Sequence, residues 1–132
     1  MKRAVLLMAT AVMSAAGCGS SSLAPDAAIA CGWNEPDSPI VSALEADDQQ
    51  LAENAERATS RLEAARRVDE ADGRFGALVE ALQETADFAV ELTTMPRPQI
   101  ASIPNSRWDF AKYAQAAARD QCEQLAAVVE AQ

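Results

Sequence analysis

The sequence contains no histidine, and only 5% of its 132 residues are aromatic. Histidine is the commonest protein ligand for metals and the usual general base near neutral pH, so its absence removes the simplest routes to metal binding and acid–base catalysis. The chain also lacks a glycine-rich phosphate-binding loop, and none of its carboxylates falls on an apolar helix face. We therefore expect neither enzymatic activity nor a bound metal or cofactor.

Basic residues are also scarce. Lysine and arginine number 11 against 20 aspartates and glutamates, which gives a formal net charge of −9. Such an acidic body repels phosphate backbones and anionic headgroups, so we expect no nucleic-acid binding. The length fits at most one domain. The chain is 49% hydrophobic and holds 30 alanines, a composition that favours close-packed helices over a β-sandwich or barrel.

The N-terminal residues have the three parts of a signal peptide. Lys2 and Arg3 are basic, residues 4–13 (AVLLMATAVM) are apolar, and residues 14–17 are small. A ten-residue helix covers about 15 Å, against roughly 30 Å for the core of a bilayer, so this run is too short for a permanent span. No later stretch of the sequence approaches a span either. We therefore expect the body of the protein outside the cytoplasm.

The end of this segment, residues 14–18 (SAAGC), resembles the lipobox of bacterial lipoproteins. The resemblance implies that the Cys18 thiol receives a diacylglyceryl group, that the chain is cut before Cys18, and that its new amine accepts a further fatty acid such as palmitate. Two or three chains make a membrane anchor effectively permanent. Ala15 stands where that family prefers leucine, and Ser14-Ala15-Ala16 also fits the ordinary signal peptidase, which would cut after Ala16.

The cysteine count supports the lipoprotein interpretation. Three cysteines are present, and lipidation of Cys18 would leave Cys31 and Cys122 as a pair. Their disulfide would close a loop of about 90 residues and stabilise an alanine-rich core by at most about 4–5 kcal/mol. Two free thiols or pairing between chains are the alternatives.

The position of Cys122 also bears on the order of the helices. Cys122 lies nearer the end of the last predicted helix than its start, which slightly favours a last helix antiparallel to the first over an up-down-up order.

These features divide the chain into three segments. We predict a signal peptide over residues 1–17, a lipidated cysteine with a flexible tether over residues 18–30, and a helical bundle over residues 31–132. The tether is predicted because residues 19–30 (GSSSLAPDAAIA) are small and polar without an apolar period.

The fold predicted for the third segment is an all-α three-helix bundle. The first helix is expected to start at a Ser38 (or Asp37) cap and end near Asp69, the second to cover 74–93, and the third to follow a cap at Ser106. Glu53–Arg57 and Glu63–Arg67 have the spacing of ion pairs within the first helix. The predicted apolar faces comprise Ile40, Val41, Leu44, Leu51, Ala55, Ala58, Leu62 and Ala65; Phe75, Leu78, Val79, Leu82, Ala86, Ala89 and Leu92; and Trp108, Ala111, Ala118, Cys122, Leu125 and Val129.

Few residues outside these faces are candidates for function. The loop 95–104 carries three prolines and is predicted to be extended, with Arg97 as a candidate contact for a partner protein. Trp33 either contacts a partner or packs over the disulfide, and Gln115 either recognises a partner or bonds a neighbouring helix. The acids Glu45, Asp47 and Asp48 fit a solvated first helical turn better than a cation site.

The sequence therefore favours a membrane-anchored bacterial lipoprotein of the cell envelope. Its acidic helical domain would have a non-enzymatic role, either protein interaction or as an accessory subunit, and it could also pair with a second copy of itself. The alternative is an anchored inhibitor or immunity factor that neutralises a basic toxin or hydrolase acting on the envelope. A small-molecule carrier is less favoured, because the aromatic residues are dispersed along the chain.

Overall fold

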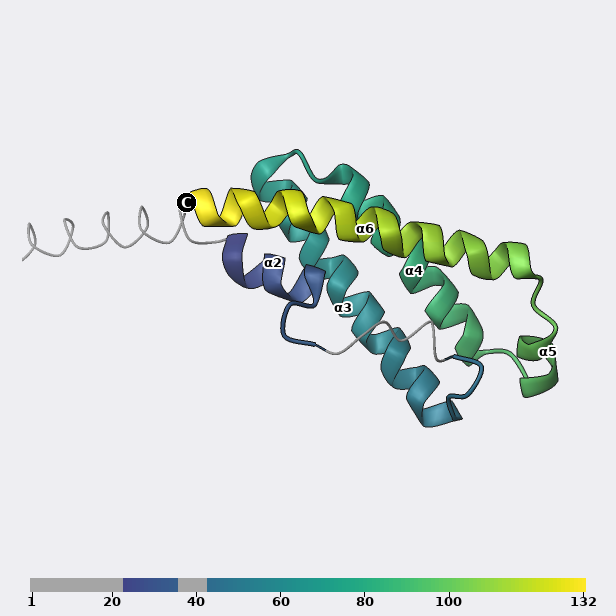
Figure 1. The fold of residues 1–132 in the computed structure, drawn as a ribbon. Coiled ribbons are helices and arrows are strands. Elements are labelled where there is room, and N and C mark those ends of the chain that lie inside the picture. The colour runs from purple at the N-terminus through teal and green to yellow at the C-terminus, as the bar shows by residue number, and fades with distance from the viewer. Residues whose placement is uncertain (1–22, 36–42) are drawn as a thin grey trace, which may run out of the picture.

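The computed structural model describes residues 23–35 and 43–132, and these form an all-α bundle (Figure 1). Within the described ranges there is no strand, as the composition predicts. The helices, in chain order, are α2 (Leu23–Cys31), α3 (Asp48–Asp72), α4 (Gly76–Thr93), α5 (Arg97–Ala101) and α6 (Asn105–Ala131). The three long helices correspond to the three that were predicted, and α2 and α5 are additional.

The long helices are arranged around α4. It packs against both α3 and α6, while α2 lies against α3 and α6 at one end of the bundle (Figure 1). The chain runs up α3, down α4 and up α6, so the slight preference for an antiparallel last helix is wrong. That preference assumed that Cys31 leads directly into the first long helix. Residues 32–47 intervene instead, and the residues directly after α2 contact the middle of α3 through Arg57 and Arg61.

Residues 23–30 are not a flexible tether, and this part of the prediction is wrong. They form most of α2, in which Leu23, Ala27 and Ala30 are buried. These three residues follow a helical spacing of four and three, so a single face of the helix packs on the bundle. Pro25 is tolerated because it lies in the first turn of the helix, where a backbone N–H would have no hydrogen-bond acceptor within the helix. The packed domain therefore begins at least as early as Leu23.

Helix α3 begins later than the sequence indicated. The predicted cap at Ser38 lies outside the described residues, but residues 43–47 are not helical, and Leu44 is 57% exposed. Asp47 is the N-cap: its carboxylate accepts from the Gln50 N–H at 2.8 Å, and the Gln50 side chain accepts from the Asp47 N–H at 2.9 Å. This capping box satisfies two amide groups that a helix start otherwise leaves unpaired. The acids at this position therefore start a helix, as expected.

The proline-rich connection is partly helical, so the predicted extended loop is also wrong. Pro96 is the N-cap of α5 and Pro98 lies in its first turn. A backbone N–H in the first turn has no acceptor within the helix, so the N–H that proline lacks costs no hydrogen bond there. Ile100 is buried and fixes the short helix on the bundle. α6 then starts at Asn105, directly after Pro104 and one residue before the expected cap at Ser106.

Two apolar clusters form the core, and between them they confirm most of the predicted helix faces. The disulfide-end core joins α2, α3, α4 and the second half of α6, and 17 buried residues form it: Leu23, Ala27, Ala30, Ala55, Ala58, Leu62, Ala64, Ala65, Val68, Phe75, Leu78, Ala81, Leu82, Ala86, Ala89, Ala118 and Leu125. The α5-end core comprises Ala43, Ala46, Leu51, Phe88, Leu92, Ile100 and Ala111, with Met95, Ile103 and Trp108 packed against it.

Candidate functional site

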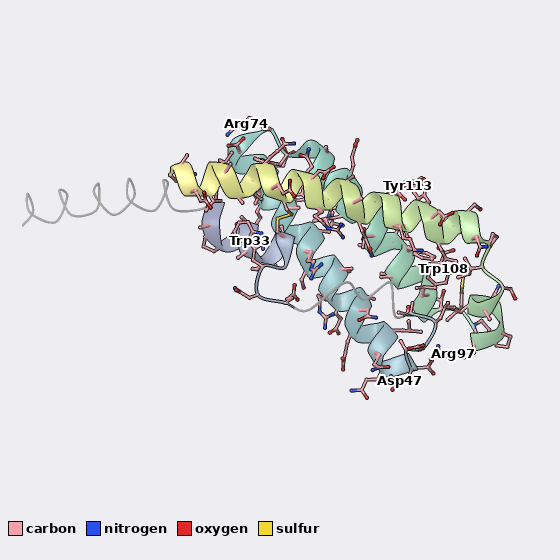
Figure 2. The ribbon with its side chains drawn as sticks, viewed as in Figure 1. Trp33, Asp47, Arg74, Arg97, Trp108 and Tyr113 are labelled. Carbon is pink, nitrogen blue, oxygen red and sulfur yellow. A yellow bond between two sulfur atoms is a disulfide. The ribbon has the colours of Figure 1, made fainter. Side chains whose placement is uncertain are left out.

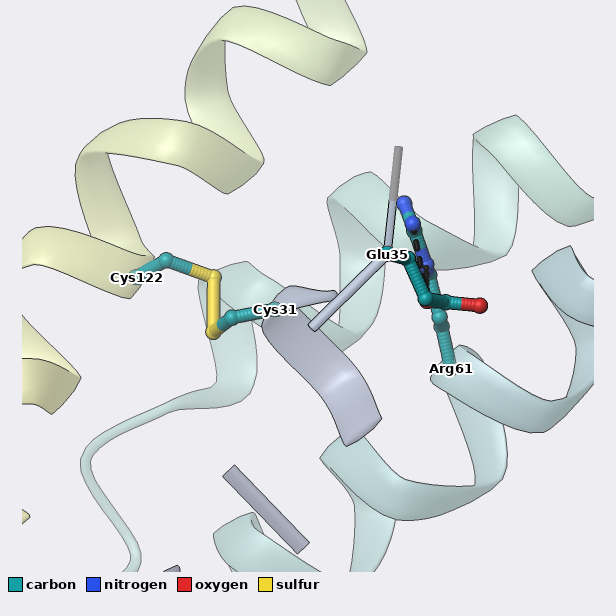
Figure 3. Close-up of a disulfide and its surroundings, with 4 residues drawn as sticks. All are labelled: Cys31, Glu35, Arg61 and Cys122. Atoms are coloured by element: carbon teal, nitrogen blue, oxygen red, sulfur yellow. Dashed lines mark hydrogen bonds and ion pairs between the residues drawn. A yellow bond between two sulfur atoms is a disulfide. The ribbon is translucent and has the colours of Figure 1, made fainter. Parts of the chain in front are cut away.

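A disulfide joins the end of α2 to α6 and confirms the predicted pairing of Cys31 with Cys122 (Figure 3). The two sulfur atoms are 2.09 Å apart, and the two Cα atoms are 5.8 Å apart. The latter distance lies within the range that a disulfide spans without backbone movement. The bond fixes α2 in the angle between α3 and α6.

A glycine turn directly follows the disulfide. Gly32 has a φ of 61°, which is the left-handed conformation that favours glycine. Its N–H donates to the Ile29 carbonyl and the Trp33 N–H donates to the Ala28 carbonyl, both at 3.2 Å, which is the hydrogen-bond pattern of a Schellman motif. A Cβ at Gly32 would collide with the Arg61 guanidinium. The turn therefore directs the next residues back over α3.

Glu35 joins this turn to α3 through ion pairs with two arginines. One carboxylate oxygen lies 2.9 Å from Arg61 Nη2 (Figure 3). The other lies 3.3 Å from Arg57 Nε. Farther along α3, Arg67 pairs with Asp26 of α2 at 2.9 Å. The sequence had predicted that Arg57 and Arg67 pair within their own helix, whereas the ion pairs in the structure tie α3 to the N-terminal segment.

A cavity of about 380 Å³ lies beside the disulfide. Its apolar lining is made largely of small side chains, and Leu82 and the buried Thr85 contribute from α4. The Thr85 hydroxyl donates to the Ala81 carbonyl at 3.0 Å, so this buried polar group is satisfied within the helix. The remaining lining residues come from α2 and the turn after it, α3 and α6: Ala30, Cys31, Gly32, Trp33, Glu35, Arg57, Ala58, Arg61, Gln115, Ala118, Arg119, Cys122, Glu123 and Ala126.

The cavity has a locally positive charge on an acidic protein. Three arginines line it (Arg57, Arg61 and Arg119) against two glutamates (Glu35 and Glu123), while the whole chain has a net charge of −9. Arg57 and Arg61 share the Glu35 carboxylate. Arg119 is exposed and makes no ion pair with any described residue. Arg119 is therefore the arginine of this lining whose guanidinium is engaged by no described carboxylate.

A second hollow, of about 540 Å³, shares Glu35, Arg57 and Arg61 with the first. It adds Glu53 and Glu56, so its charged lining comprises three acids and two arginines. Unlike the cavity beside the disulfide, this hollow is locally negative.

The structure places the two candidate partner contacts far apart. Trp33 is 43% exposed and lines the cavity together with both cysteines, whereas Arg97 is the exposed first residue of α5 at the opposite end of the bundle (Figure 2). Gln115 is half-buried and also lines the cavity. Cys18 lies outside the described residues. No sequence pattern pointed to Arg119, although it lies one helical turn before Cys122 and so shares its helix face.

The described residues lack two further features that would point to a function. No group of three or more His, Cys, Asp or Glu side chains is arranged to hold a metal ion there. No helix among these residues is both long and apolar enough to cross a membrane. Comparisons with protein families, with curated proteins and with solved structures gave no match.

Proposed function

We propose that this protein is a bacterial envelope lipoprotein, anchored through a lipid on Cys18, whose helical domain binds another protein outside the cytoplasm. The observation that carries this proposal is the division of the three cysteines. Cys31 and Cys122 form the internal disulfide, which leaves Cys18 for modification. Disulfides of this kind persist in oxidising compartments, and Cys18 follows a signal-peptide pattern that would deliver the chain to one.

The early start of α2 adds a geometric consequence. Leu23 is the first described residue of the packed domain, five positions after Cys18. A fully extended chain of five residues spans at most about 17 Å, so a lipid on Cys18 would hold the domain close to the bilayer surface. The partner would therefore itself be in the membrane or close to it.

The acidic composition indicates the character of that partner. The net charge of −9, which becomes −11 when Lys2 and Arg3 leave with the signal peptide, attracts basic surfaces and increases association rates with them. This property also fits the second candidate function, an anchored inhibitor of a basic envelope-acting toxin or hydrolase. Chemical crosslinking in intact cells, followed by detergent extraction and mass spectrometry, distinguishes the two: an envelope protein supports the accessory role, and a secreted basic toxin or hydrolase supports inhibition.

The anchor is tested by the intact mass and membrane fractionation of the exported protein. We expect the wild-type chain to start at Cys18, to carry the mass of two or three acyl chains, and to sediment with membranes. Cys18→Ser should release it into the soluble fraction. The matched control is Cys31→Ser/Cys122→Ser, which removes two cysteines and their disulfide but keeps Cys18 and should stay on the membrane. A water-soluble wild-type product that starts at Gly17 without acyl mass would overturn the proposal.

A further inference from the structure

We propose that the cavity beside the disulfide binds a single-chain anionic amphiphile, with its apolar chain against α4 and its negative head beside Arg119. The carboxylate of a medium-chain fatty acid is the ligand chemistry that fits best. This inference goes beyond the proposed function and does not depend on it, because it rests only on described residues of the domain.

The apolar part of the cavity is produced by small side chains. Ala58 and Ala118 are buried at its wall, and Leu82 is buried at the face contributed by α4. Both alanines belong to the disulfide-end core, and because their side chains are small, an apolar hollow remains beside that core between α3 and α6. Apolar hollows of this kind accept apolar ligands, and the burial of each CH₂ group contributes about 0.8 kcal/mol.

The polar part selects the charge of the ligand. The three arginines and two glutamates that line the cavity leave one positive charge, which one negative head would neutralise. Arg119 is available for this role, since Arg57 and Arg61 are already engaged with Glu35. The neighbouring hollow, whose charged lining has a net negative charge, would repel the same head. Charge complementarity therefore favours an anion at the first site.

The volume limits the size of the ligand. About 380 Å³ is near the lower end of the range of about 300–1,000 Å³ for small-molecule sites. We infer that the cavity accepts one acyl chain of medium length rather than a two-chain phospholipid. Trp33 and the disulfide would lie against that chain, because both line the same space.

Trp33 also provides a direct probe of binding. The chain has two tryptophans, and the other, Trp108, packs against the α5-end core away from the cavity. In the exported full chain carrying Cys18→Ser and Trp108→Phe, purified without detergent, fluorescence reports Trp33 alone. Titration with decanoate or dodecanoate, below the concentration at which each forms micelles, should give a saturable change. The longer chain has two more CH₂ groups and should bind several-fold to about fifteenfold more tightly, depending on how far both are buried.

Two variants separate the polar from the apolar contribution. Arg119→Gln should weaken dodecanoate binding by about three- to tenfold, because an exposed charged contact contributes modestly. Arg97→Gln, which removes the same charge at the far end of the bundle, should leave binding unchanged. Ala118→Leu should fill the cavity and abolish binding, and its circular dichroism spectrum would show that the bundle is retained.

The control ligand is dodecyltrimethylammonium, which has the same chain and the opposite charge. We expect no saturable change in Trp33 fluorescence at concentrations where dodecanoate saturates. Equal responses to the two amphiphiles, or an Arg119→Gln variant that binds dodecanoate as well as the parent, would overturn the proposal. Failure of membrane anchoring in the wild-type chain would leave this result unaffected, so the two proposals fail separately.

Discussion

The two ends of the bundle are stabilised in different ways. At the α5 end, large side chains fill the core: Phe88 and Ile100 are fully buried, and Trp108 meets Phe88 edge-on, with their ring centroids 5.1 Å apart. The Arg107 guanidinium lies 4.3 Å from the Phe88 ring centroid and forms an ion pair with Glu91 of α4 at 2.6 Å. At the disulfide end, more than half of the buried core residues are alanine. A disulfide joins α2 to α6, and ion pairs join α2 and the turn after it to α3.

This difference follows from how much apolar surface each end buries. An alanine contributes far less buried area than a leucine or a phenylalanine, so an alanine-rich interface gains less from the hydrophobic effect. Helix α2 has nine residues, and helices shorter than about 12 residues are marginal alone in water. Ion pairs between helices are present at both ends, so the disulfide is the link that compensates at the disulfide end for the apolar burial that larger side chains supply at the α5 end.

Removal of the disulfide is the strongest test of this comparison. A disulfide between two cysteines with a sequence separation of 91 stabilises the fold by about 4–5 kcal/mol in the chain-entropy model. Cys31→Ser/Cys122→Ser should therefore reduce the free energy of unfolding by about that amount, as measured by chemical denaturation. Hydrogen exchange should show α2 opening first, while amides around Phe88 stay protected. If α2 remained as protected as α4, packing alone would hold it and the comparison would fail.

The matching change at the other end is Phe88→Ala. Truncation of a fully buried phenylalanine costs about 3–5 kcal/mol, because it removes apolar burial and leaves a cavity. We expect an increase in hydrogen exchange at α5 and the start of α6, a change in Trp108 fluorescence, and retained protection of α2. Val90→Ala on the same helix is the control, and since Val90 is 46% exposed its effect should stay below about 0.5 kcal/mol. Equal loosening of both ends would show that the two cores are a single cooperative unit.

The two left-handed glycines give a smaller, matched comparison at the disulfide end. Gly73 ends α3 with a φ of 85° and open space around it, whereas Gly32 faces the Arg61 guanidinium. Gly73→Ala should cost about 1 kcal/mol, from backbone strain alone. Gly32→Ala should cost about 2 kcal/mol, because it also displaces Arg61 from Glu35. Denaturation midpoints measure both, and equal losses would mean that the Glu35 bridge contributes nothing.

Helical periodicity predicted the long helices well but not the elements between them. The apolar positions of α4 and α6 recur at regular steps of three and four. Over Phe75–Leu92 and Ala111–Leu125, these positions are buried largely as the pattern indicates. The early start assigned to α3 came from the Ser38-Pro39 signal, although Asp47 and Gln50 have the spacing of a capping box. The local signal for the correct start was therefore present in the sequence.

Helix α2 and the cavity depend on contacts that local patterns do not encode. Residues 23–30 have few large apolar residues, and their helix is held by Cys122, Arg67 and the core, all distant in sequence. The cavity likewise requires the relative placement of α2, α3, α4 and α6. Alanine's high helix propensity was a usable signal for α2, but tertiary packing decides whether such a segment folds. The Cys31–Cys122 pairing was predictable because cysteine arithmetic needs no geometry.

The smallest effect is expected at the turn between α3 and α4, where Asp72 meets Arg74. The Arg74 guanidinium lowers the pKa of Asp72 below 3.8, mainly through a side-chain hydrogen bond and also through its charge. A carboxyl whose pKa is lowered by folding stabilises the native state above its unfolded pKa, and this contribution disappears as the pH falls through the folded pKa. Asp72→Asn should therefore lower stability slightly at neutral pH, less so in high salt because the pair is exposed.

Denaturation midpoints of wild type and Asp72→Asn, measured from pH 7 down to the most acidic pH at which the protein stays folded, give the test. The two curves should converge toward the acidic end. Asp120→Asn, which removes the same charge from an exposed position on α6, separates the pair from a change in net charge. If the difference between wild type and Asp72→Asn kept its size below the lowered pKa, it would arise from the turn conformation rather than from the ion pair. In that case the disulfide end would be stabilised by the links that join separate helices, because an exposed ion pair within one turn would add nothing to its stability.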